Sequence, residues 1–206
     1  MSYIIGLTGQ SGAGKTTICE FLKQAGFGII NCDEIARQCT ADGSYCNKQL
    51  SKVFPSCFDE KLSIDRKGIS KIIFSDKKKL KLFDDIVYPH INKLIDDNIK
   101  ALSVSSDIIV LDAPTLFEAG ADKKCDCIIG VIAKKAVRLE RITARDNISA
   151  ELALKRFGSQ RSAKFFKEQC EYIIENNGSD IQLKAKTEKI IKRIKERSNG
   201  KEKTKT

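Results

Sequence analysis

The chain has 206 residues, 41% hydrophobic and 31% charged, so it can bury one large core with or without an appended lobe. It has neither the roughly 20-residue apolar run of a membrane-spanning helix nor a signal peptide after Met1, which predicts a cytoplasmic protein without a membrane partner. The net charge of +10 does not indicate a nucleic-acid partner. Half of it (+5, from eight Lys or Arg against three Glu) lies in the lysine-rich stretch 187–206, and this stretch lacks aromatic residues that could stack on bases.

Five short apolar segments, taken in chain order, are predicted to be strands. They cover residues 3–8, 27–31, 107–112, 127–133 and 172–175. The segments between them carry helical patterns. The first helix is expected over 15–24, a second from Asp33 through Arg37, and the last over 180–197. Short apolar strands that alternate with helices indicate an α/β fold with a mainly parallel five-stranded sheet covered on both faces.

Two longer helical stretches interrupt this alternation. Residues 40–103 are charged and helical, with expected interruptions at Pro55, Gly68 and Pro89, and are too long for one crossover connection. A second helical stretch, 136–167, is expected to break near 146–149 and at Gly158. We therefore expect one domain over 1–206. Its parts are a core (about 1–39, 104–136 and 168–198), a helical insert (about 40–103), an Arg-rich lid (about 137–167) and a basic tail (about 199–206).

The strongest motif is GQSGAGKT at 9–16, which directly follows the first predicted strand. Glycines let such a loop turn tightly and aim its N–H groups at phosphate oxygens, and the next helix adds the positive end of its dipole. Lys15 is expected to reach the β- and γ-phosphates of a nucleoside triphosphate, and the Thr16 hydroxyl to bind Mg²⁺. The loop residues expected to bind nucleotide are Gly9, Ser11, Gly12, Ala13, Gly14, Lys15, Thr16 and Thr17. A dinucleotide fingerprint would require glycine in place of Thr17.

Two aspartates follow predicted strands. Asp112 ends the apolar run 108–111, as does a Walker B carboxylate that binds Mg²⁺ directly or through water. Asp33 follows the second strand and suits either a base that accepts an alcohol proton or a helix N-cap. From the residues alone these two interpretations of Asp33 weigh equally. Arg37, one helical turn later, is placed to bind a substrate anion.

Arginines gather in the second helical stretch. Arg138, Arg141 and Arg145 are spaced to share one helical face, and Arg156 lies four residues before Gln160. Such a hairpin can close over the γ-phosphate, exclude water and neutralise developing charge. The alternative is an ordinary solvated basic face.

The remaining candidates for chemistry have structural interpretations. The eight cysteines contain no CxxC pair and are expected to be reduced thiols that serve as small hydrophobic residues rather than zinc ligands. The only histidine, His90, is expected to be structural or exposed at a helix start after Pro89.

Together these segments resemble the dephospho-CoA kinase family over residues 5–178. The segments that carry the resemblance are LTGQSGAGKTT at 7–17, NCDEIAR at 31–37, YPHI at 88–91, LDAPTLFEAG at 111–120, RITARDN at 141–147, Arg156 with Gln160, and YIIENNG at 172–178. The chain departs from the family pattern in three places. Asn31 stands where an aspartate is usual, Tyr88-Pro89 replaces His-Pro, and a lysine expected near Phe166 is missing.

The resemblance implies a P-loop kinase fold and ATP-dependent phosphorylation of the ribose 3′-hydroxyl of dephospho-CoA, with Mg²⁺. It implies that Asp33 is the catalytic base, that Arg141 and Arg145 are lid arginines acting with Lys15, and that the insert binds the CoA moiety. The substrate-binding residues it suggests are Asp33, Arg37 and Glu118; the metal-binding residues are Thr16 and Asp112.

Two alternatives remain open, and a third lacks its motif. One is another P-loop small-molecule kinase, acting on a nucleoside or nucleotide. A GTP-dependent switch would need an Asn-Lys-x-Asp base reader, and the segment 92–95 lacks the final Asp. A basic nucleic-acid-binding ATPase would use the C-terminal charges. The favoured interpretation is a monomer that acts on a small molecule, with no nucleic-acid partner.

Overall fold

The computed structural model describes residues 2–158 and 160–203. The chain forms two compact units. The core unit comprises residues 1–30 and 102–206, and the insert unit comprises residues 31–101. Each unit is described by itself below.

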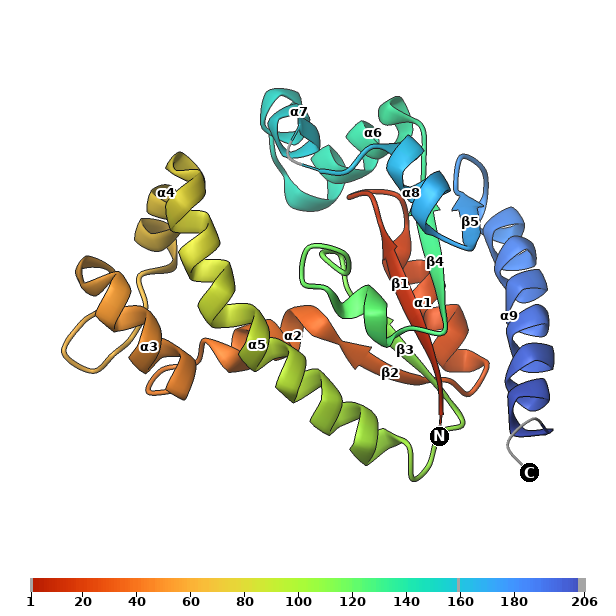
Figure 1. The fold of residues 1–206 in the computed structure, drawn as a ribbon. Coiled ribbons are helices and arrows are strands. Elements are labelled where there is room, and N and C mark those ends of the chain that lie inside the picture. Colours follow the sequence, from red (N-terminus) through yellow and green to blue (C-terminus); the bar gives the residue numbers. More distant parts are fainter. Residues whose placement is uncertain (1, 159, 204–206) are drawn as a thin grey trace. The chain divides into compact units, whose positions relative to one another are not determined.

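The core unit is built on a five-stranded sheet. Its strands are β1 (Tyr3–Gly9), β2 (Gly28–Asn31), β3 (Ile108–Asp112), β4 (Cys127–Ile132) and β5 (Tyr172–Glu175), in the order β2-β3-β1-β4-β5. The central strand β1 pairs in parallel with β3 and β4, and β4 pairs in parallel with β5 (Figure 1). The predicted α/β fold with a mainly parallel five-stranded sheet is therefore confirmed.

The strands form where the sequence is apolar on both faces. The consecutive residues Ile109, Val110 and Leu111 on β3 are completely buried, and on β1 both Ile4 and Ile5 are buried. Alternate residues point to opposite faces of a strand, so burial of both sets requires helices on both sides of the sheet. The carboxyl ends of β1 and β3 are in register, because Leu7 lies opposite Asp112.

The helices of the core unit follow the strands. They are α1 (Lys15–Gln24), the 3₁₀ helix η2 (Ala121–Lys124), α6 (Lys135–Asp146), α7 (Ala150–Gly158), α8 (Ala163–Gln169) and α9 (Asp180–Lys203). The bounds of α1 match the prediction. The last helix is longer than predicted, because α9 continues to Lys203; the final three residues of the expected basic tail, 204–206, lie outside the described residues.

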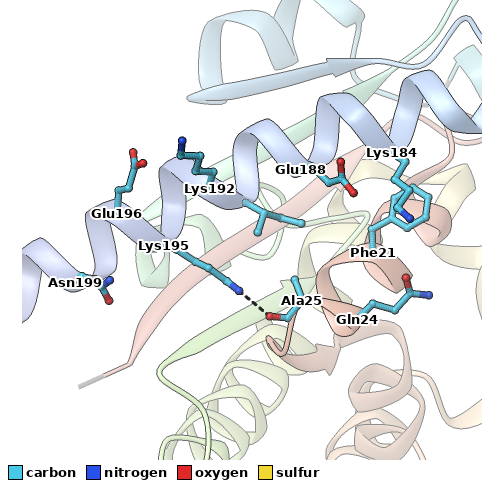
Figure 2. A pocket seen from close by; sticks show the side chains of 10 residues that line it. Phe21, Gln24, Ala25, Lys184, Glu188, Lys192, Lys195, Glu196 and Asn199 are labelled. Atoms are coloured by element: carbon cyan, nitrogen blue, oxygen red, sulfur yellow. Dashed lines mark hydrogen bonds between the residues drawn. The ribbon is translucent and has the colours of Figure 1, made fainter.

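The helices α1 and α9 pack beside one another and leave a groove of about 480 Å³ between them. Figure 2 shows Lys195 of α9 reaching across to Ala25, whose carbonyl oxygen accepts a hydrogen bond of 3.0 Å from Nζ. Ala25 is the C-cap of α1, where carbonyl groups lack helical partners and a cation is favourable. The groove thus flanks the C-terminal end of α1, at the opposite end of that helix from the glycine-rich loop.

The insert unit is helical. Its elements are α2 (Cys32–Cys39), α3 (Tyr45–Val53), the 3₁₀ helix η1 (Pro55–Cys57), α4 (Arg66–Ser75) and α5 (Lys77–Leu102). The expected interruption at Pro55 is confirmed. Those at Gly68 and Pro89 are wrong, because Gly68 lies within α4 and Pro89 within α5. His90 is consequently inside a long helix rather than at a helix start, and its ring packs edge-on against Tyr45 with centroids 5.1 Å apart.

The long helix α5 tolerates its proline because of its neighbours. A proline inside a helix removes one backbone hydrogen bond and disfavours the helix by about 3 kcal/mol. Val87, Ile91 and Ile95 are buried around and after Pro89, so apolar burial on this face offsets that cost. All eight cysteines are free thiols and seven are buried, as expected of small hydrophobic side chains. No helix of the described residues is long and apolar enough to span a bilayer.

Candidate active site

The glycine-rich loop connects β1 to α1, and two of its glycines are required by close packing. A Cβ atom on Gly9 would lie 2.2 Å from the backbone oxygen of Val131, on the neighbouring strand β4. Gly14 is the N-cap of α1 in the left-handed conformation (φ 95°), and a Cβ there would lie 2.3 Å from Nδ2 of Asn176. The loop is therefore held tightly between β4 and the turn after β5.

Lys15 and Asp112 meet at the carboxyl edge of the sheet. Lys15 begins α1, Asp112 ends β3, and Lys15 Nζ forms an ion pair with Asp112 Oδ1. Their side chains are only 17% and 15% exposed, so the pair is largely shielded from water. The structure thus brings together the predicted phosphate-binding lysine and the predicted Walker B carboxylate.

The same edge of the sheet carries side-chain oxygen atoms of the kind that Mg²⁺ prefers as ligands. Thr16 is exposed at the start of α1, one residue after the lysine that contacts Asp112. No group of three or more His, Cys, Asp or Glu side chains within residues 2–158 and 160–203 could hold a metal. A hydroxyl and a carboxylate nevertheless fit Mg²⁺, which keeps several waters and binds through one or two protein oxygens plus substrate phosphates.

Arg138 packs beneath the loop instead of facing solvent. It is 5% exposed, its Nε donates to the Ser11 carbonyl oxygen at 2.8 Å, and its Nη2 donates to Gln160 Oε1 at 2.9 Å. Its guanidinium also lies 4.1 Å from the ring centroid of Phe157. Burial lowers the pKa of Arg138, because desolvation disfavours the charged form. The alternative of a solvated basic face is therefore wrong for Arg138.

Gln160, between α7 and α8, completes this network. Its Oε1 also accepts from the Ser11 N–H at 3.1 Å, and its Nε2 donates to Ser11 Oγ. A single side chain from the segment between α7 and α8 thus contacts both the main chain and the side chain of the loop.

The other two arginines of α6 behave differently from one another. Arg141 Nη1 donates to the carbonyl oxygens of Gly12 at 3.4 Å and Asn176 at 3.2 Å, so it lies against the loop. Arg145 is 60% exposed and forms an ion pair of 2.7 Å with Asp146. Hydrogen bonds from Arg145 and then Arg156 lower the pKa of Asp146 to about 2. In this structure Arg145 is therefore held at the end of α6 by its neighbouring carboxylate.

The expected substrate-binding residues lie in different parts of the chain. Asp33 and Arg37 belong to α2 of the insert unit, and both are exposed. Asn31 is the N-cap of α2: its Oδ1 accepts from the backbone N–H groups of Asp33 and Glu34, each at 3.1 Å. The capping interpretation of Asp33 is therefore wrong, and its carboxylate accepts no hydrogen bond from the described residues.

Glu118, expected to bind substrate, follows β3 and pairs with Arg161 of the segment between α7 and α8. Glu118 Oε1 accepts from Arg161 Nε at 2.9 Å. Arg161 also lies 4.8 Å from the ring centroid of Phe165. The Glu118–Arg161 ion pair ties the segment after β3 to the segment between α7 and α8.

Asn176 is a contact residue of the loop that we did not predict. It follows β5, is 5% exposed, and its Nδ2 donates to the Ala13 carbonyl oxygen at 2.9 Å. The sequence predicts Asn176 only as part of the turn after the last strand. Its position after the carboxyl end of a strand, within a segment of the family resemblance, was the available signal.

Several known proteins are similar to this chain over most of its length. The sequence model of the family described as dephospho-CoA kinase matches residues 3–182. A dephospho-CoA kinase of Fusobacterium nucleatum is 35% identical over 192 residues (93% of this chain, 98% of that protein), and one of Latilactobacillus sakei is 31% identical over 195 residues (94% and 96%). The solved dephospho-CoA kinase from Campylobacter jejuni superposes with a TM-score of 0.70 at 25% identity, covering 98% of this chain and 100% of that chain. A shikimate kinase from Bacteroides thetaiotaomicron, with a TM-score of 0.51, 11% identity and coverage of 94% and 98%, shares the fold alone.

Proposed function

The chain belongs to the dephospho-CoA kinase family, and from this premise we propose that it transfers the γ-phosphoryl group of ATP to the ribose 3′-hydroxyl of dephospho-CoA, giving CoA and ADP. It is an ATP-dependent phosphotransferase of P-loop kinase fold that acts in coenzyme A biosynthesis. The observation that carries the assignment is the family match over residues 3–182, which includes an intact phosphate loop with Lys15 and Asp112 side by side.

In this proposal the loop binds the triphosphate of ATP. Backbone N–H groups of the loop, the N-terminus of α1 and Lys15 supply positive potential to the phosphates. Thr16 and Asp112 would hold Mg²⁺, which neutralises charge on the phosphate oxygens during transfer. In this proposal Lys15 exchanges its ion pair with Asp112 for the phosphates.

The acceptor side of the reaction is assigned to the insert unit. The 3′-hydroxyl oxygen attacks the γ-phosphorus, its proton passes to the Asp33 carboxylate, and the bond to ADP breaks. The Asp33 carboxylate is exposed and accepts no hydrogen bond from the described residues, which supports this role because a base must be free to accept a proton. Arg37 is proposed to bind an anionic group of the acceptor, and Glu118 is proposed to contact the acceptor at another group.

The lid region is assigned to charge neutralisation. Arg141 lies against the loop, and Arg145 is proposed to leave Asp146 and approach the γ-phosphate when the lid region, about 137–167, closes. The helical insert, about 40–103, is proposed to bind the CoA moiety. We also propose a cytoplasmic monomer without a nucleic-acid partner, which light scattering and electrophoretic mobility with DNA and RNA would test.

The substrate assignment is tested by comparing acceptors. ADP formation from Mg²⁺-ATP is measured with dephospho-CoA, AMP, adenosine or shikimate at matched concentrations. Dephospho-CoA should stimulate turnover well above the background ATPase rate, and the other acceptors should not. A protein that phosphorylates AMP or adenosine but ignores dephospho-CoA would belong to the nucleoside or nucleotide kinases of the same fold.

A further inference from the structure

Three successive carbonyl groups of the phosphate loop each accept a hydrogen bond from a side chain outside it. The donors are Arg138 to Ser11 at 2.8 Å, Arg141 to Gly12 at 3.4 Å, and Asn176 to Ala13 at 2.9 Å. The two arginines come from α6 and the asparagine from the turn after β5. We call Arg138, Arg141 and Asn176 the outer brace.

The outer brace determines where the loop's N–H groups point. A peptide unit is planar and trans, so its C=O and the N–H of the following residue point in opposite directions. The carbonyls of Ser11 and Ala13 point toward the brace, which aims the N–H groups of Gly12 and Gly14 the other way. In residues 2–158 and 160–203, neither of these two N–H groups donates a hydrogen bond.

Asn176 is built into this arrangement more closely than the arginines. Its side chain is buried, and its Nδ2 occupies the space that a Cβ atom on Gly14 would need, 2.3 Å away. Arg141 donates to the Asn176 carbonyl oxygen at 3.2 Å, which joins two members of the brace directly. The asparagine therefore fixes the Ala13–Gly14 peptide unit both by its hydrogen bond and by contact.

The brace also places positive charge behind the loop. No carboxylate within the described residues forms an ion pair with Arg138, which is 5% exposed and donates only to uncharged acceptors. A buried cation without a counter-ion favours the approach of an anion. The positive charge of Arg138 and the orientation of the Gly12 and Gly14 N–H groups thus both favour the binding of an anion at the loop.

We propose that Asn176, with Arg138 and Arg141, is a positioning residue of the nucleotide site that holds the N–H groups of Gly12 and Gly14 toward the polyphosphate. Asn176 acts through the loop and does not itself touch the phosphates. This inference rests on the proposed function only in requiring that the loop bind a polyphosphate; the identity of the acceptor plays no part in it.

The test is the substitution Asn176→Asp, with Asn177→Asp as its matched control. The first variant replaces the Nδ2 donor by an oxygen that faces the Ala13 carbonyl. The control introduces the same charge one residue later, where Asn177 Oδ1 only accepts a hydrogen bond from the Lys134 N–H at 2.7 Å and aspartate can still accept it. The affinities of ATP and of inorganic tripolyphosphate are measured by calorimetry for both variants and the parent protein. Tripolyphosphate has no base or sugar, so it reports on the loop alone.

Asn176→Asp should weaken ATP and tripolyphosphate by the same factor, at least tenfold, while Asn177→Asp changes either by less than threefold. A loss confined to ATP would place Asn176 at the adenosine moiety and overturn the proposal. Unchanged affinities, with or without a lower melting temperature, would reduce Asn176 to a structural role and also overturn it. If Asn176→Asp does not fold, Arg138→Lys tests the Ser11–Gly12 peptide unit by the same measurement, and unchanged tripolyphosphate affinity again refutes the brace. Failure to phosphorylate dephospho-CoA would leave these binding results unaffected.

Discussion

Replacing Asp33 by asparagine separates a catalytic role from a structural one. The substitution is nearly isosteric and leaves the N-cap of α2 in place, because the capping side chain is that of Asn31. The loss of a helix cap, about 1 kcal/mol, is therefore avoided. The remaining structural cost is the loss of one acidic residue from the first turn, roughly 0.3–1 kcal/mol of unfolding free energy.

The expected effect on catalysis is much larger. A positioned general base contributes about 10²–10⁴ to the rate, which corresponds to roughly 3–5 kcal/mol of the activation barrier. Asp33→Asn should therefore lower kcat with dephospho-CoA by at least a hundredfold. ATP affinity should change by less than threefold, because the phosphate loop lies in the core unit and is not altered.

Glu34→Gln provides the matched control for this experiment. Glu34 is also exposed, also lies in the first turn of α2, and also loses one negative charge. Steady-state ADP release, ATP titration and urea unfolding would be measured for both variants. If kcat falls equally in the two variants, or stays near normal in Asp33→Asn, the assignment of Asp33 as the base is wrong.

Three further predictions concern the core unit. Lys15→Met should lower turnover at least a hundredfold, and it should cost about 1–2 kcal/mol of unfolding free energy because Asp112 loses its partner. A double-mutant cycle with Asp112→Asn, measured by urea unfolding, tests this coupling, and additive costs of the two substitutions would contradict it. Gly9→Ala should destabilise the protein by roughly 3 kcal/mol, because the new Cβ would lie 2.2 Å from the backbone oxygen of Val131. Thermal unfolding measures this effect, and a melting temperature equal to that of the parent protein would show that β1 and β4 can separate locally. Burial raises the pKa of the Cys170 thiol to about 12, so its thiolate form is suppressed at every pH below that value. Iodoacetamide should therefore label Cys170 slowly at about pH 8 and faster as the pH rises, as measured by mass spectrometry of tryptic peptides. Rapid labelling at that starting pH would show that the site opens.

The sequence was most informative where one local pattern decides the structure. The glycine-rich loop, the helix beginning at Lys15 and the strand ending at Asp112 were all predicted, because glycine spacing and apolar runs are short-range signals. Asp33 was located after its strand, but its role was not resolved. The structure excludes the N-cap interpretation, because Asn31 supplies the cap, and the role of Asp33 as the base stays a prediction.

The misses have a common physical cause. Pro89 and Gly68 were expected to interrupt helices, yet tertiary burial in the insert unit overrides a local preference of about 1–3 kcal/mol. Asn176 has the sequence neighbourhood of a turn, yet its side chain contacts the phosphate loop. A single donor supplied from far along the chain leaves no periodic trace, so spacing could not identify Asn176, whereas the shared helical face of Arg138 and Arg141 did indicate both arginines.

The outer brace has a consequence for the order in which the protein is made. Asn176 contacts Ala13 across 163 residues of sequence, and Arg138 contacts Ser11 across 127. A chain emerging from the ribosome carries its glycine-rich motif first and the groups that orient it last. ATP affinity should therefore be acquired late in translation, and a nascent chain that ends before Asn176 would display the motif without a completed site.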